Sequence, residues 1–208
     1  MRTERRHGTS ARIGIAPFNV ERGTEPSMAL PSTIHRFQIQ LADTARNVYQ
    51  DLDLRIARHP SETMPYLVTR VLAYCIAYEE GIAFSTGLST PDEPAIWVKD
   101  LTGQIKAWIE VGMPAPDRLH KASKSQDRVM VFPHKPVELF KRQCAGQRIH
   151  KSEAIRIIAL EPDFVRKVEA TIDRNVRWDV SIHDGHLFLT TNGQALGSTV
   201  EEHQLEAQ

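Results

Sequence analysis

The sequence predicts an α/β domain built around a mixed β-sheet. Two hydrophobic patterns alternate along the chain: short runs in which every second residue is apolar, and longer runs in which apolar residues recur every three to four positions. The first pattern is typical of half-buried strands and the second of helices. The predicted order is a hairpin, a helix, three strands, a helix, a strand, a helix, a strand, a helix and a second hairpin. Interleaved strands and helices are characteristic of α/β folds.

The first half of the chain begins with two alternating runs, at 33–43 and 49–57, which predict an antiparallel hairpin. Ser61 is then expected to cap a helix that extends to about Glu80. Glu62 would lie in the first turn of this helix, where a carboxylate suits the helix dipole.

Three short strands are expected next, at 82–85, 95–98 and 105–111, with a turn at 100–103 between the last two. The remaining predicted elements are a helix from Pro116 to about Lys124, a buried strand over 129–132, a helix over 136–146, a strand over 154–160, a helix over 162–174, and a hairpin of 176–182 and 186–190 turned by Asp184-Gly185.

Length and charge define the class of protein. A chain of 208 residues is long enough to bury a full core. Because 26 basic residues balance 26 acidic ones, the chain has no global attraction to nucleic acid or anionic lipid, and a nucleic-acid site would need a local basic groove. No run approaches the roughly 18 apolar residues of a membrane span, and the charged N-terminus lacks the apolar core of a secretion signal. We therefore expect a cytoplasmic protein without a membrane segment.

The composition divides the chain into three parts. Residues 1–27 are rich in Arg, Gly, Ser and Thr without periodicity, and we expect a disordered extension, with Met28 as an alternative start. Residues 28–191 are expected to form a single domain. Residues 192–208 are polar, and we expect them to form a flexible C-terminal tail.

Two acidic residues carry the main functional hypothesis. Glu110 stands in the middle of an apolar strand pattern, where an ionised carboxylate is costly to bury. Asp92 precedes the neighbouring strand, and the turn at 100–103 would allow the two acids to face each other. Carboxylate oxygens suit Mg²⁺ or Mn²⁺, which need one or two of them. The alternative is that Asp92 is a solvated loop acid and that Glu110 pairs with a lysine.

Two further residues would join this site if the fold brought them close. Glu62 is ordinary chemistry for a helix start unless that start abuts Glu110. Lys121 lies on the helix after Glu110 and would neutralise either the carboxylates or a phosphate; a solvated surface lysine is the alternative, and Lys124 competes for the same role.

Histidine and tryptophan give weaker signals. His183 and His186 flank the predicted Asp-Gly turn, which favours an exposed cross-strand pair over a metal site. Trp97 and Trp108 occupy strand positions and are interpreted as core residues, because base stacking would require exposed rings.

Several short motifs, taken together, resemble the bacterial YaeQ family. The resemblance extends over residues 28–190, and the hairpin at 182–189 is similar to the last strands of that family. The motifs are Ala57-Arg58-His59-Pro60-Ser61-Glu62-Thr63, Gly87-Leu88-Ser89-Thr90, Asp92-Glu93-Pro94, Lys99-Asp100-Leu101-Thr102-Gly103, Trp108-Ile109-Glu110-Val111-Gly112 and Lys121-Ala122.

The resemblance implies a restriction-endonuclease-like, PD-(D/E)XK fold: a mixed sheet flanked by helices, with N-terminal and C-terminal hairpins added. It also implies a metal-dependent nuclease that acts on the phosphodiester bonds of nucleic acid. By position, the acids that would hold Mg²⁺ or Mn²⁺ are Asp92, Glu110 and Glu62, with Glu93 assisting.

Two positions depart from the nuclease pattern. The lysine expected two residues after Glu110 is Gly112, and Lys121 is the candidate replacement; an acid found in some relatives is Ala95 here. These departures motivate a second hypothesis, in which the fold is catalytically inactive and binds nucleic acid or a protein partner.

Overall fold

The computed structural model describes residues 32–85 and 92–206 of the chain. Within these ranges it contains ten strands, four α-helices and one 3₁₀ turn. The strands are β1 (Thr33–Asp43), β2 (Val48–Arg58), β3 (Ile82–Phe84), β4 (Ile96–Lys99), β5 (Ile105–Val111), β6 (Val129–Phe132), β7 (Arg156–Leu160), β8 (Asn175–His183), β9 (His186–Thr191) and β10 (Gln194–Gln204). The helices are α1 (Met64–Ile76), α2 (Pro116–Ser125), α3 (Val137–Cys144) and α4 (Pro162–Glu169), and the 3₁₀ turn is Ser152–Ala154.

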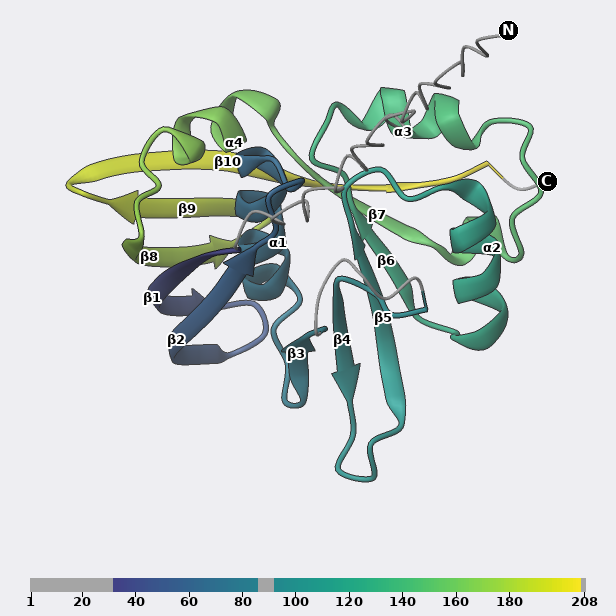
Figure 1. Ribbon diagram of the computed structural model, residues 1–208, viewed down its shortest axis with the longest axis horizontal. Helices are drawn as coiled ribbons and strands as arrows, with labels where there is room; N and C mark the ends of the chain where they lie inside the picture. The colour runs from purple at the N-terminus through teal and green to yellow at the C-terminus, as the bar shows by residue number, and fades with distance from the viewer. Residues whose placement is uncertain (1–31, 86–91, 207–208) are drawn as a thin grey trace, which may run out of the picture. The chain divides into compact units, whose positions relative to one another are not determined.

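All ten strands belong to one mixed sheet, in the order β2-β1-β8-β9-β10-β7-β6-β5-β4-β3 (Figure 1). The pairs β1–β8, β5–β6 and β6–β7 are parallel, and the other neighbours are antiparallel. The prediction of a mixed α/β fold is therefore confirmed at this level, together with both hairpins and the bounds of β5 and β6.

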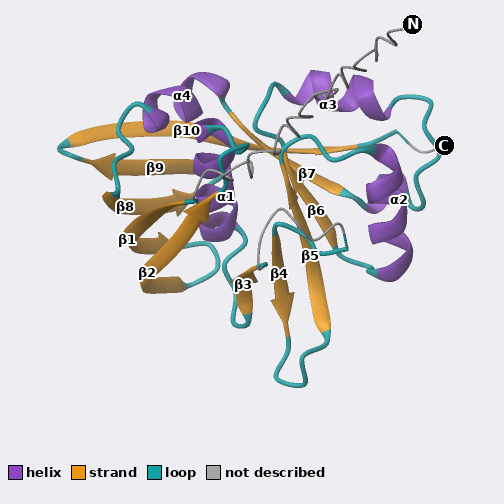
Figure 2. Ribbon diagram, viewed as in Figure 1, coloured by secondary structure: helices purple, strands orange, loops and turns teal. Residues whose placement is uncertain are grey.

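Helix α1 packs against both parts of the sheet. Leu67 and Val71 belong to a buried cluster with β1, β8, β9 and α4. Ala73 and Tyr74, further along α1, belong to a second cluster with β4, β5 and β6. Helices α2 and α3 lie on the other side of β5–β7 and build a third cluster there (Figure 2). The buried faces on the two sides of β5 thus fix the strand that carries Glu110.

The start of α1 differs from the prediction. The N-cap is Thr63, whose hydroxyl accepts a hydrogen bond from the Tyr66 N–H at 3.4 Å. Ser61 instead bonds the His59 ring at 2.7 Å, so its predicted capping role is wrong. Glu62 precedes the cap and closes the turn between β2 and α1, where its carboxylate accepts from the His59 N–H at 3.0 Å.

The expectation of a flexible tail is wrong for residues 194–204. They form β10, which pairs with β9 through Gln194–Thr199 and with β7 through Val200–Gln204. This strand therefore joins the two parts of the sheet. Its polar sequence hides it, because most of its side chains are exposed.

Several helices are shorter than predicted. Helix α1 ends at Ile76, and α4 ends at Glu169 although its apolar spacing predicted a longer helix. The second hairpin has its Asp184-Gly185 turn with both residues at positive φ, and His183 lies opposite His186 as predicted. The extension over 1–27 and the Gly87–Thr90 motif lie outside the described residues. None of the described helices is long and apolar enough to cross a membrane.

Candidate functional site

The candidate site lies where β5 and β6 end and α1 begins. These two strands run parallel, with Val111 beside Phe132, and the Gly112 N–H donates to the Phe132 carbonyl at 2.8 Å. The carboxyl ends of parallel strands are where α/β folds most often place their binding sites. Glu110 is two residues from this edge.

Glu110 is buried, with 4 % of its surface exposed. Its Oε1 accepts two hydrogen bonds, one from the Trp108 indole at 2.6 Å and one from Arg118 Nε at 2.8 Å. Burial raises the pKa of Glu110, while the Trp108 and Arg118 donors oppose that rise. No residue in the described part of the chain bonds Oε2, so one carboxylate oxygen is available.

Arg118 connects Glu110 to the segment that precedes β4. Besides its bond to Glu110, its guanidinium donates from Nη2 to the main-chain carbonyl of Glu93. Asp92, the residue before Glu93, is exposed. The predicted approach of the two acidic segments is therefore mediated by an arginine that the sequence motifs did not single out.

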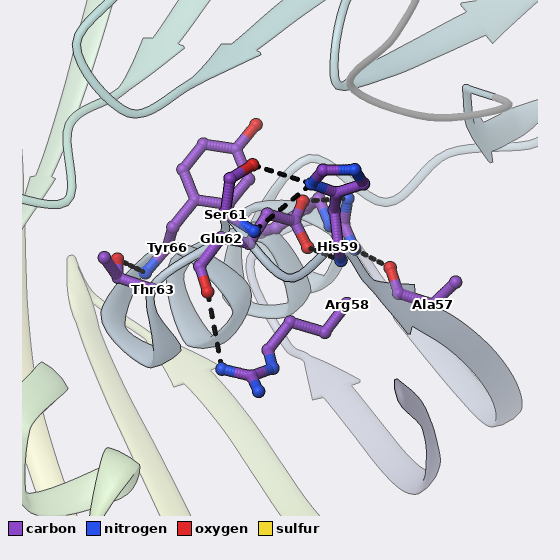
Figure 3. A network of polar contacts seen from close by, with 8 residues as sticks. Ala57, Arg58, His59, Ser61, Glu62, Thr63 and Tyr66 are labelled. Atoms are coloured by element: carbon purple, nitrogen blue, oxygen red, sulfur yellow. Dashed lines mark hydrogen bonds and ion pairs between the residues drawn. The ribbon is translucent and has the colours of Figure 1, made fainter. Parts of the chain in front are cut away.

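Glu62 makes a second buried ion pair (Figure 3). Its Oε1 accepts from Arg70 Nη1 at 2.8 Å, and its Oε2 accepts from the His59 N–H at 3.0 Å. Arg70 also donates to the Ala57 carbonyl at 3.0 Å, so it ties α1 to the end of β2. Burial raises the pKa of Glu62, and the Arg70 charge opposes that rise. Both oxygens of this carboxylate are already used.

Tyr66 lies within electrostatic range of both pairs. Burial raises its pKa to about 12, and charges on Arg70, Glu62, Glu110 and Arg118 all act on its hydroxyl. The ring contacts the Arg70 guanidinium at 5.9 Å and the His134 ring at 6.0 Å, measured to ring centroids. Tyr66, in the first turn of α1, is therefore a residue on which the charges of both ion pairs act.

The position that the resemblance would give to a lysine is closed to any side chain. Gly112 has φ +97°, and a Cβ there would lie 2.9 Å from Tyr66 Cε2 and 3.4 Å from His134 Nδ1. His134 Nδ1 is buried and has no hydrogen-bond partner in the described residues. Burial, with a smaller effect of Lys135, lowers the pKa of His134, which keeps the imidazole neutral at pH 7.

The other predicted residues are spread more widely. Lys121 and Lys124 are exposed on α2, and neither makes an ion pair within the described residues. No group of three or more His, Cys, Asp or Glu side chains in those residues could hold a metal ion. Arg118 thus links Glu110 to the main chain of Glu93, whereas Glu62 pairs with a different arginine, Arg70.

The two tryptophans are half-buried rather than fully enclosed. They lie opposite each other on β4 and β5, and the Lys99 ammonium is 3.4 Å from the centroid of the Trp97 ring system. Trp108 packs partly against the cluster under α2 and donates to Glu110. The hydrogen bond between Trp108 and Glu110 was foreseeable from the sequence, because the two residues are two apart on one strand. The sequence did not predict the contacts made by Arg118, Arg70, Tyr66 and His134.

The sequence of this chain is similar to a known family and to two of its members. The family model described as "YaeQ protein" matches residues 28–200. "Uncharacterized protein YaeQ" of Escherichia coli (strain K12) is 31 % identical over 165 residues, covering 78 % of this chain and 91 % of that protein. The Salmonella typhi protein of the same name is 30 % identical over 170 residues, with the same coverage of each chain.

Two crystal structures have the same fold. The YaeQ protein from Xanthomonas axonopodis pv. citri aligns with a TM-score of 0.75 at 29 % identity, covering 84 % of this chain and 99 % of that one. The YaeQ protein from Pseudomonas syringae aligns with a TM-score of 0.73 at 32 % identity, covering 85 % and 97 %. The motifs, the family model and these structures agree, and the chain belongs to the YaeQ family.

Proposed function

We propose that this chain is a metal-dependent phosphodiesterase that acts on nucleic acid and uses the carboxyl edge of β5 as its active site. The observation that carries the proposal is the Arg118 bridge. One guanidinium bonds both the Glu110 carboxylate and the main chain of Glu93, and through this link the Asp92 carboxylate would lie beside a buried acid. A restriction-endonuclease-like core would combine acids from these same two segments.

The residues present suit a hard divalent cation. Glu110 offers Oε2, and Asp92 is an exposed carboxylate with no partner in the described residues. Glu93 is the third candidate ligand. Because Mg²⁺ keeps several waters and substrate oxygens in its shell, two carboxylates are sufficient. A bound Mg²⁺ or Mn²⁺ would supply charge stabilisation for a phosphoryl oxygen.

The protein side chains would orient and balance charge. Arg118 holds the Glu110 carboxylate in a single orientation, with Oε1 bonded and Oε2 directed elsewhere. Lys121 lies one turn further along α2 and is the proposed cation for the phosphate, a position that i and i+3 residues on a helix share. Glu62 would act only on the position of α1, since both of its oxygens are bonded.

A second candidate function is a catalytically inactive binding module for nucleic acid. Gly112 favours it, because the packing of Tyr66 and His134 leaves no space for the lysine of the nuclease pattern. The half-buried pair Trp97 and Trp108, with Lys99 over one ring, offers the aromatic and cationic groups that single strands bind.

Thermal unfolding with and without Mn²⁺ or Mg²⁺ tests the first function. A bound cation raises Tm by mass action, and we expect this shift for the wild type and its loss in Glu110→Gln and Asp92→Asn. Asp117→Asn removes an exposed acid from α2 and should keep the shift. A metal-dependent cleavage assay on single-stranded and duplex DNA and RNA completes the test.

The results of these experiments distinguish the two candidate functions. A cation shift that persists in Glu110→Gln would reject the site. Metal-independent binding of a labelled oligonucleotide, without cleavage and without a cation shift, would support the binding module instead.

A further inference from the structure

The outer face of strands β2, β1, β8 and β9 is a large surface far along the sheet from β5. The helices that contact this part of the sheet, α1 and α4, both pack on its buried side through Phe37, Trp178 and their neighbours. Side chains on the opposite face are exposed or half-buried along all four strands. Within the described residues, this face is uncovered.

One row across this face is acidic and polar. The register places Gln40 of β1 between Asp51 of β2 and Asp179 of β8, and Thr190 of β9 follows next to Asp179. All four side chains are exposed. Neither Asp51 nor Asp179 has a hydrogen bond or ion pair to a described residue. Within residues 32–85 and 92–206, these two carboxylates thus have no cation of their own.

The adjacent row combines two aromatic rings with small residues. Tyr49 of β2 and Phe188 of β9 are 60 % and 51 % exposed. Between them lie Ala42 of β1 and Ser181 of β8, in register with both. Because large side chains flank small ones, the face is hollowed here into a depression of about 470 Å³.

The depression continues along the strands. A second hollow of about 480 Å³ shares Gln40, Asp51 and Asp179 with the first. It extends into the basic part of the face, because Arg177, Gln38 and Asp53 also line it. There Arg177 bonds Gln38 at 3.1 Å, and Asp53 pairs with Arg36 at 2.5 Å. The face thus has an acidic, aromatic half, whose two carboxylates have no partner among the described residues, and a second half that contains Arg36 and Arg177.

We propose that this acidic half binds a segment of a partner protein that carries arginine side chains. The charge complementarity is direct, since a guanidinium forms forked hydrogen bonds with a carboxylate. A guanidinium also stacks on aromatic rings, which Tyr49 and Phe188 provide at the rims. Nucleic acid is disfavoured, because its phosphates would be repelled by Asp51 and Asp179.

The spacing of the carboxylates specifies the ligand further. Asp51 and Asp179 lie on strands separated by β1, so their Cα atoms are about two inter-strand spacings, or roughly 10 Å, apart. A single guanidinium does not bridge that distance, so two arginines are needed. Arginines at alternate positions of an extended segment project from the same side about 7 Å apart, and their flexible stems reach both acids.

A binding titration with a labelled Gly-Arg-Gly-Arg-Gly peptide tests the proposal, by fluorescence anisotropy against the full chain at low ionic strength. We expect saturable binding that weakens about tenfold in the Asp51→Asn/Asp179→Asn variant, since each exposed pair contributes up to about a factor of five. Phe188→Ala and Tyr49→Ala should each weaken it about threefold to fivefold. Asp117→Asn, an exposed acid on α2, is the matched control and should bind like the wild type.

Two further ligands make the test specific. The same peptide with glutamate in place of arginine should not bind, and the lysine version should bind more weakly, because an ammonium cannot fork or stack as a guanidinium does. Thermal unfolding of each variant checks that the sheet is intact. All four substitutions are on exposed side chains, where stability changes are small.

Three results would overturn the proposal. The first is absence of arginine-peptide binding by a folded wild-type chain. The second is binding that the double Asp→Asn variant retains at full strength. The third is binding of a neutral oligosaccharide such as maltotetraose in place of the peptide, which would assign the aromatic rims to a sugar.

Discussion

Two buried glutamates in this molecule have similar surroundings and different uses. Glu62 and Glu110 are each about 5 % exposed or less, and each pairs with an arginine at 2.8 Å. The Glu62 pair is closed, because the second oxygen binds a main-chain N–H and the Arg70 side chain is only 8 % exposed. The Glu110 pair is partly open: Arg118 is 29 % exposed, and Oε2 has no partner in the described residues.

A buried acid is therefore not by itself a functional site. Glu62 fastens the turn between β2 and α1, and every donor around it belongs to that turn or to α1. Glu110 is fastened by Oε1 only, and its Oε2 has no partner in the described residues. The number of oxygens without a partner in the described residues, rather than burial or a raised pKa, is what distinguishes the two carboxylates.

Removing the arginine of the closed pair should have the largest effect. Arg70→Ala leaves Glu62 buried without a cation and also removes the bond to Ala57. Breaking a buried pair in this way costs about 3–5 kcal/mol of unfolding free energy. Chemical denaturation measures it, with Arg166→Ala, which breaks an exposed pair on α4, as the control. A loss below about 1 kcal/mol would contradict the structural role of this pair.

Removing the arginine of the open Glu110 pair should cost less unfolding free energy. Arg118→Ala should lose about 2 kcal/mol, because solvent reaches the site and the Trp108 donor remains to hold Glu110. It should also release the Glu93 main chain and so weaken any stabilisation by Mn²⁺. An Arg118→Ala variant as unstable as Arg70→Ala would remove the distinction between the two pairs.

The smallest expected effect is a change of the unfolding free energy with pH. Burial raises the pKa of Glu110, so the folded state keeps its proton to a higher pH than the unfolded chain, whose carboxyl titrates near about 4.3. Protonated Glu110 therefore stabilises the folded state fully below the pKa of the unfolded chain. This stabilisation is lost as the pH rises through the raised pKa of the folded state.

Glu110→Gln cannot titrate, and this provides the measurement. The unfolding free energy of the wild type relative to Glu110→Gln should fall between pH 4 and pH 7, by about 1.4 kcal/mol for each unit by which the pKa is raised. A difference that stays constant, or that grows with pH, would mean that Arg118 outweighs the effect of burial.

Sequence patterns predicted most of the framework but not all of it. The bounds of β5 came directly from the alternation of Ile105, Ala107, Ile109 and Val111, because one face of this strand is buried against α1. Strand β10 was missed because neighbouring strands satisfy its backbone, while most of its side chains are polar and about half of them are exposed. The capping error at α1 arose because Ser61 and Thr63 are both good caps, and only the His59 contact decides between them.

The site was predicted less completely, for a different reason. Glu110 was found because an acid in an apolar run is anomalous. Its partner Arg118 is eight residues away on α2, and Glu62 and Arg70 are also eight apart across an element boundary. No local sequence pattern predicts such an ion pair, because it depends on how α1 and α2 lie against the sheet. Whether Asp92, Glu93 and Lys121 act with Glu110 stays a prediction for the metal-binding experiments.

Strand β10 has a consequence for how the molecule comes to be assembled. It is the last strand in chain order, yet it occupies the middle of the sheet between β9 and β7. During synthesis, the strands on either side of β10 leave the ribosome before β10 does. Until β10 emerges, β9 and β7 each lack the neighbour that pairs with them. The hydrogen-bonded register between them is therefore settled only once residues 194–204 have emerged, and a chain that stops upstream of that point would have only the packing of α1 to hold the two half-sheets together.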